Sequence, residues 1–182
     1  WTQRSGCGPE STIIQGAGTS TVFLSDSRDT VFDGFTVTGG TIGFYLNGGQ
    51  LTVYNSIIRD NSGNGFAQAN TASRLILVSN SEIYNNGGTG IAIAHTSTVI
   101  ENSTIRNNNI GISAVNGSFS ITDSVFKDNT NRGLQIAGAG SLSCERCSIS
   151  GNSGGGVYLN TGTNTFRNSI FADNHTTNTG GA

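Results

Sequence analysis

The chain lacks several features of an ordinary helical or mixed domain. Its 182 residues include no methionine, one proline and only 11% charged side chains. Strong helix formers are scarce, whereas 27 glycines and many Asn, Ser and Thr residues separate short apolar runs. This composition argues against helical solenoids and α/β domains, and it favours short strands joined by tight turns.

A charge excess and a long apolar run are also missing. The formal net charge is −2, and basic residues occur singly, so the chain lacks the basic patch of a nucleic-acid-binding protein. No run approaches the ~20 apolar residues that span a bilayer, and the start shows no basic-then-apolar signal sequence. We therefore expect no nucleic-acid partner and no membrane span in this chain.

The length favours one domain, covering residues 1–182. The chain begins at Trp1 without an initiator methionine, and the segment from Thr179 to Ala182 resembles the start of another strand. We expect a fragment or a processed part of a longer protein. Because neither end carries an obvious cap, we expect either that further segments cover the ends or that copies of the chain associate end to end.

A repeat of 21 to 25 residues runs through the sequence. The pattern Asn-Ser-x-(Ile/Phe)-x-x-Asn recurs in four copies and in variant form in two more, and two apolar strand patterns accompany it. Alternate residues of a strand point to one face, so each copy predicts three short strands with about five inward side chains. The central apolar residues of the pattern form one inward column: Val37, Ile58, Ile83, Ile105, Phe126, Ile149 and Phe171.

One copy cannot bury its apolar face alone, but copies stacked about 4.8 Å apart form a continuous core. The predicted fold is therefore an all-β, right-handed parallel β-helix of about seven coils with three strands per coil. The handedness follows from the strong preference of parallel crossover connections for the right hand.

The second Asn of each pattern predicts a ladder at the turns. Asn tolerates left-handed backbone, and its side-chain amide both donates and accepts hydrogen bonds, so like residues in adjacent coils can bond to one another. Glycosylation sequons also begin at Asn102, Asn116 and Asn174; the first and last are expected at ladder positions and therefore inaccessible. The predicted ladder comprises Asn61, Asn86, Asn108, Asn129, Asn152 and Asn174.

The segment from Asp33 to Gly40 and the repeated Asn-Ser-x-Ile-x-x-Asn motif resemble the right-handed β-helix, pectin-lyase-like superfamily. The resemblance covers the chain from about Ser11 onward and implies the fold. It implies little about activity, because that superfamily includes lyases, hydrolases, epimerases, tailspikes, adhesins and plain surface domains. The last copy, with Phe171 to Asn174 and Gly180 to Ala182, resembles repeats of polymorphic outer-membrane proteins of the autotransporter type.

One outward column carries charge. Arg59, Tyr84, Arg106 and Lys127 are expected to stack as neighbours, with Asp60 and Asp128 beside them. Such a stripe can bind an anionic glycan through charge and stacking. As a lyase or epimerase site, it would use Arg59, Arg106 or Lys127 with Asp60 or Asp128. The alternative is a solvated face whose opposite charges alternate.

Cys144 and Cys147 form a Cys-x-x-Cys motif, which elsewhere indicates redox or zinc chemistry. Here the repeat places Cys144 in an inward apolar column and Cys147 in a column otherwise held by serine. We favour buried free cysteines, with a disulfide across the corner as the alternative. Cys7 lies several coils away and is out of reach of both.

These observations lead to two hypotheses. The first is a non-catalytic extracellular or cell-surface domain that acts as a stalk, adhesin or self-assembling unit, with weak glycan affinity at most. The second is a polysaccharide lyase or epimerase acting on acidic glycans. No cofactor is expected under the first hypothesis, and Ca²⁺ is expected only under the second.

Overall fold

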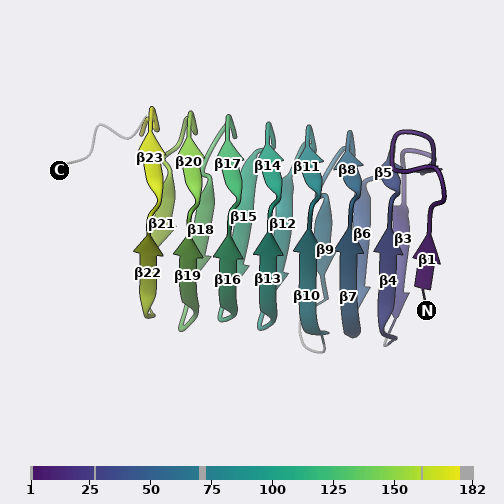
Figure 1. Ribbon diagram of the computed structural model, residues 1–182, viewed down its shortest axis with the longest axis horizontal. Helices are drawn as coiled ribbons and strands as arrows, with labels where there is room; N and C mark the ends of the chain where they lie inside the picture. Colours follow the sequence, from purple (N-terminus) through teal and green to yellow (C-terminus); the bar gives the residue numbers. More distant parts are fainter. Residues whose placement is uncertain (1, 27, 70–72, 161, 177–182) are drawn as a thin grey trace.

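The computed structural model describes residues 2–26, 28–69, 73–160 and 162–176, and in these ranges it contains strands and no helix. The 23 strands form three parallel sheets of eight, eight and seven strands, here called sheets A, B and C. Consecutive strands belong to A, B and C in turn, so three strands make one coil. Figure 1 shows the coils side by side along one axis, with sheet C behind sheets A and B. The predicted all-β parallel β-helix of about seven coils is confirmed.

The strands are short because each coil turns three corners. Sheet A contains β1 (Thr2–Arg4), β4 (Thr30–Asp33), β7 (Gly49–Tyr54), β10 (Ser73–Ser79), β13 (Ser97–Glu101), β16 (Ser118–Thr122), β19 (Ser141–Glu145) and β22 (Asn164–Arg167). Sheet B contains β2 (Ile13–Gln15), β5 (Thr36–Thr38), β8 (Ile57–Arg59), β11 (Glu82–Tyr84), β14 (Thr104–Arg106), β17 (Val125–Lys127), β20 (Ser148–Ser150) and β23 (Ile170–Ala172). Sheet C contains β3 (Thr21–Asp26), β6 (Ile42–Asn47), β9 (Phe66–Gln68), β12 (Thr89–Ala94), β15 (Ile110–Val115), β18 (Leu134–Ala137) and β21 (Val157–Leu159).

The core consists of the inward residues of all three sheets. Like residues of successive coils are register partners, as the repeat predicts, and each column is buried along most of its length. Burying stacked Ile, Val and Phe side chains contributes roughly 1.5–3 kcal/mol per side chain. Representative partners are Ile58, Ile83 and Ile105 in sheet B, Phe66, Ile91 and Ile112 in sheet C, and Val53, Val78 and Ile100 in sheet A.

The first coil, β1 to β3, extends the stack one coil beyond the sequence alignment. Ile14 pairs in register with Val37, and Phe23 pairs with Phe44. Phe23 also packs edge-to-face on Phe32, with ring centroids 4.5 Å apart. This coil lacks the Asn-Ser pattern, so the aligned columns did not extend to it.

Asn side chains connect the coils inside the turn after sheet B. Nδ2 of Asn61 donates to Oδ1 of Asn86 at 2.9 Å, and Nδ2 of Asn86 donates to Oδ1 of Asn108 at 3.0 Å. The chain of amides continues to Asn174, and each Oδ1 also accepts the backbone N–H of the preceding Asn. Oδ1 of Asn61 accepts from the N–H of Gly40, so the ladder extends to a coil without an Asn.

Left-handed backbone residues form the corner between sheets A and B. Asn102 is one of them, with φ 46°, and its side chain is exposed rather than part of the ladder. The expectation that the Asn102 sequon is inaccessible is therefore wrong. Asn174 does lie in the ladder, whereas Asn116 is exposed, with its Oδ1 accepting the N–H of Ala139 at 2.7 Å.

Gln68 connects its coil to the next one by side-chain hydrogen bonds where strand β9 ends early. The coil from Ile58 to Ile83 is the longest, at 25 residues, and β9 pairs with only part of β12. Gln68 occupies the register position of inward Leu46. Its Oε1 accepts the N–H of Ala94 at 2.9 Å, and its Nε2 donates to the Thr96 hydroxyl. The side-chain amide thus bonds to β12 where the backbone of β9 has ended.

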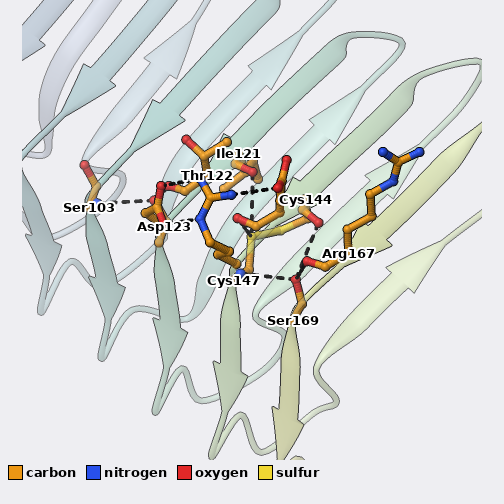
Figure 2. Close-up of a disulfide and its surroundings, with 11 residues drawn as sticks. Ser103, Ile121, Thr122, Asp123, Cys144, Cys147, Arg167 and Ser169 are labelled. Atoms are coloured by element: carbon orange, nitrogen blue, oxygen red, sulfur yellow. Dashed lines mark hydrogen bonds and ion pairs between the residues drawn. A yellow bond between two sulfur atoms is a disulfide. The ribbon is translucent and has the colours of Figure 1, made fainter.

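Cys144 and Cys147 form a disulfide, with Cα atoms 6.1 Å apart and exposed fractions of 1% and 2%. The favoured expectation of free cysteines is corrected, because the inward side chains on either side of the corner lie close enough to bond. Figure 2 shows the disulfide at this corner, next to Ser169 of the following coil. Cys147 occupies the position that Ser56, Ser81, Ser103 and Ser124 hold in other coils. Cys7 is free and exposed.

Asn108→Ala tests the ladder. Asn108 is 1% exposed and donates to the carbonyls of Ile83 and Arg106. The substitution leaves buried donors and acceptors unpaired, so we expect the free energy of unfolding to fall by about 1–3 kcal/mol. Urea denaturation measures it. Asn109→Ala, at an exposed neighbouring position, is the control and should change little; equal stability of Asn108→Ala and wild type would contradict a structural role for the ladder.

Candidate functional site

The predicted charged stripe lies on the outer face of sheet B. Tyr84 pairs in register with Arg59 on one side and with Arg106 on the other, and Arg106 pairs with Lys127. Each is the last residue of a three-residue strand whose middle residue points into the core, so the four side chains point outward. Asp60 and Asp128 follow in left-handed turn conformation, with φ values of 54° and 55°.

Carboxylates neutralise both arginines of the stripe. Arg59 donates to Oδ2 of Asp60 at 3.0 Å, and Arg106 donates to Oε2 of Glu82 at 3.2 Å. Sequence reasoning missed Glu82, although its position two residues before Tyr84 places it on the same outward face. Together with Asp128, the carboxylates Asp60 and Glu82 balance the three basic residues, so the stripe has no formal charge excess.

The ring of Tyr84 is in contact with a cation of the same stripe. The guanidinium carbon of Arg106 lies 4.1 Å from the centre of its ring. A cation over an aromatic face is attracted by the ring quadrupole, so this contact orients Arg106 along the helix axis. It also covers one ring face, which is then closed to a stacking sugar.

Lys127 differs from the arginines. Within the part of the chain that the structure describes, no carboxylate lies within salt-bridge distance of its ammonium group. Its side chain is half-buried at the edge of the stripe, and Asp128 follows it at the exposed turn. Lys127 is therefore the cation of the stripe with the most freedom to meet an anionic ligand.

A shallow hollow of about 320 Å³ lies beside the stripe. It is lined by Ile57 and Glu82 of sheet B, by Asn55, Ser56 and Asn80 of the corner, and by Pro9 and Glu10 of the loop before β2. Of the stripe and its counter-ions, only Glu82 lines this hollow, and Glu82 is already paired with Arg106.

Other candidate groups are dispersed. His95 lies in a turn with φ 56°, and His175 follows β23 at an exposed position. Glu101 and Glu145 are separated in register by Thr122, two coils apart as expected. Among the described residues, no group of three or more His, Cys, Asp or Glu side chains is placed to hold a metal ion. Within the same residues, no helix has the length and hydropathy to cross a membrane.

A second charged cluster lies at the disulfide corner. Nε of Arg146 donates to Oδ1 of Asp123 at 2.6 Å and its Nη2 to Oδ2 at 2.8 Å, while its Nη1 donates to Oε1 of Glu145 at 2.6 Å. The hydrogen bond from Arg146 holds the pKa of the Asp123 carboxyl below its ordinary value; desolvation opposes this effect, and the guanidinium charge adds to it. Asp123 likewise raises the pKa of Arg146. Sequence reasoning did not connect these residues.

The lowered pKa predicts an acid-dependent loss of stability. A carboxyl whose pKa is depressed by folding contributes stability above its unfolded pKa of about 3.9, and the contribution disappears as the pH falls through the folded pKa. The melting temperature of wild type should therefore drop more than that of Asp123→Asn between about pH 4 and pH 2. Asp173→Asn, at another left-handed turn residue without a described ion pair, is the control. Parallel pH profiles of wild type and Asp123→Asn would contradict the contribution of this pair.

Comparisons with known proteins agree with the geometry. No curated protein sequence matches the chain. The fold is similar to the crystal structure of pectate lyase Pel9A, with a TM-score of 0.70 and 19% sequence identity. The similarity covers 88% of this chain and 50% of that one, so this chain spans about half the length of the lyase.

The family described as the right handed beta helix region matches residues 2–98 and 68–181, which together cover nearly the whole chain. The expected right-handed β-helix is thereby confirmed. The Gly180 to Ala182 segment of the outer-membrane-protein resemblance lies outside the described residues. On the register of its coils and this match, the chain belongs to the right-handed β-helix family.

Proposed function

We propose that this chain is a non-catalytic β-helix domain that works outside the cell or at the cell surface as a rigid structural element, a stalk or an adhesin. The observation that carries the proposal is the uninterrupted ladder from Gly40 through Asn61 to Asn174. It joins successive coils by side-chain as well as backbone hydrogen bonds. Seven coils at about 4.8 Å give a rod of roughly 30 Å.

The charge pairing on sheet B supports a non-catalytic surface. A general base must be able to accept a proton from its substrate, but Asp60 and Glu82 are bonded to Arg59 and Arg106. An arginine that neutralises a substrate carboxylate would first have to leave its own partner. The stripe therefore resembles a self-neutralised solvated face more than a prepared active site.

The disulfide supports an oxidising location. Disulfides form and persist mainly outside the cytosol, and Cys144 and Cys147 are bonded here. Together with the low charge content of the chain, this favours an extracellular or cell-surface domain.

The second candidate is a polysaccharide lyase or epimerase acting on acidic glycans. Two observations favour it: the fold similarity to pectate lyase Pel9A, and Lys127 without a described carboxylate partner next to Asp128. Lys127 would then act with Arg59 and Arg106 on a uronate, with Asp60 or Asp128 as proton acceptor. Ca²⁺ belongs only to this candidate, and the first candidate requires no cofactor.

A product assay separates the two functions. Wild type is incubated with polygalacturonate and with alginate, with and without Ca²⁺, and unsaturated products are followed by ultraviolet absorbance. The proposal predicts no product above background in any condition. Steady turnover that is abolished by Arg106→Ala but retained by Arg167→Ala, an exposed arginine on sheet A, would replace the proposal with the lyase candidate.

Weak glycan affinity, if the stripe provides it, should depend on Lys127 more than on Arg59. Arg59 is already paired with Asp60, whereas the Lys127 ammonium is free of described carboxylates. Lys127→Ala should weaken binding to polygalacturonate about two- to fivefold, the scale of one exposed charge interaction, with a smaller effect of Arg59→Ala. Affinity electrophoresis measures it. Measurable binding that ignores Lys127→Ala would place any glycan site elsewhere.

End-to-end association of copies belongs to the same proposal. Exposed large apolar side chains include Ile13 and Leu24 in the first coil and Ile170 and Phe171 in β23. Of these, Phe171 is the register partner of inward Ile149, so association at this end of the stack would cover it and pair strand edges. Sedimentation of the pure protein over a range of concentrations tests this version, and a monomer throughout would remove it.

A further inference from the structure

The corner between sheets A and B requires a left-handed backbone residue in every described coil from β4 onward. Most coils supply a residue type that tolerates this conformation. The exception is the coil of β19 and β20, where the residue is Arg146 with φ 53°. The left-handed residues at this corner of the other coils are Gly34, Asn55, Asn80, Asn102, Asp123 and Asn168.

Arginine is poorly suited to this position. Its side chain lacks the short polar group with which Asn and Asp support left-handed backbone locally. For a residue of this kind, the left-handed conformation is disfavoured by roughly tenfold relative to its ordinary backbone. An interaction outside the Arg146 backbone must therefore stabilise the left-handed conformation at this corner.

The coil with the unfavourable residue is also the coil with the disulfide. Cys144 precedes Arg146 by two residues and Cys147 follows it directly, so the bond closes a four-residue segment around the left-handed position. In other coils the same two positions carry unbonded pairs such as Val53 with Ser56 and Val78 with Ser81. The two departures from the repeat thus coincide.

The corner places Arg146 where it links two coils. Its guanidinium forms a bidentate contact with Asp123 of the preceding coil and a third bond to Glu145. Figure 2 shows Asp123 beside the disulfide corner, with dashed lines to a guanidinium group. At the equivalent corner Nδ2 of Asn55 donates one bond to Asp33 at 2.7 Å, so arginine adds a second bond across the coils.

The sulfur of Cys147 lies at a position prepared for a hydrogen-bond donor. Serine hydroxyls in other coils donate to the carbonyl two residues back, as Ser103 does to Glu101 at 2.7 Å. Sγ of Cys147 lies 3.7 Å from the carbonyl oxygen of Glu145, but a disulfide sulfur carries no proton and makes only a packing contact. A reduced Cys147 thiol can donate there, so the corner accommodates both redox states.

We propose that the Cys144–Cys147 disulfide is a redox-sensitive clamp that holds Arg146 in left-handed conformation and thereby presents its guanidinium to Asp123 and Glu145. Reduction by a dithiol breaks the S–S bond, forms two thiols and leaves the dithiol as its own disulfide. The turn then relaxes, and the bridge from Arg146 to the preceding coil loosens. This clamp is independent of the function proposed above.

A double-mutant cycle in the full chain tests the coupling. The four proteins are wild type, C144V/C147S, R146N and C144V/R146N/C147S. The replacements are the residues that other coils carry at these positions, and the shared effect of C147S on the serine column cancels in the cycle. The readout is hydrogen exchange at the amides of Arg146 and Cys147, which bond to the carbonyl of Arg167 at 2.9 Å and to Oγ of Ser169 at 3.1 Å.

Loss of the disulfide should accelerate exchange at these two amides about tenfold when Arg146 is present and about twofold or less in the R146N background. The amides of Asn102 and Ser103, at the equivalent corner of another coil, are the internal control and should not change. Equal acceleration in both backgrounds, or none in either, would overturn the proposal.

Two further outcomes test the clamp and its sensitivity to reduction. If C144V/C147S fails to fold, a folded C144V/R146N/C147S supports the clamp, whereas failure of both proteins shows that the disulfide serves the fold without Arg146. Dithiothreitol treatment of wild type should reproduce the C144V/C147S exchange pattern. A disulfide that stays oxidised in folded protein under excess dithiothreitol would overturn the redox sensitivity.

Discussion

The strands of each described coil form their backbone hydrogen bonds with strands of the neighbouring coils rather than with strands of the same coil. A single coil therefore has neither satisfied peptide groups nor a buried apolar face, and it becomes stable only as a member of the stack. This requirement explains the equal rise of the coils, the identical inward columns and the side-chain ladder. Asn108 shows the extent of the constraint, because one buried amide serves the coils above and below it.

The stacking of the coils also determines which charged side chains on the outer surface meet. Outward residues of neighbouring strands are only one coil apart, so a charge on one strand meets whatever the next strands carry. Arg59, Arg106 and Arg146 each bind carboxylates on this surface. A protein surface that satisfies its own charges in this way suits a rod exposed to solvent, and it leaves Lys127 as the place where an anionic partner would meet least competition.

Repetition made the fold predictable from the sequence. Ile58, Ile83 and Ile105 could be aligned because each copy repeats the same motif, and alignment of copies is equivalent to the register of a parallel stack. The prediction failed for two different reasons. The first coil and the counter-ion Glu82 depart from the motif, so the alignment of copies did not contain them. Asn102 follows the motif as the first Asn of its copy, but this position lies at the corner between sheets A and B and not in the ladder. The pairing of Cys144 with Cys147 depends on side-chain distance across a corner, which a column alignment does not contain.

The hydrogen bonds of the Gln68 side-chain amide bear on whether the chain can accept inserted residues. A solenoid is usually thought intolerant of extra residues, since one misplaced coil would shift every coil after it. Here one side chain bonds to strand β12 where strand β9 has ended, and strand β10, after a register shift between Ser73 and Leu75, pairs regularly with β7 from Leu75 onward. Length added after Gln68 therefore need not propagate along the rod, which makes this corner a natural point for grafting a foreign loop without rebuilding the scaffold.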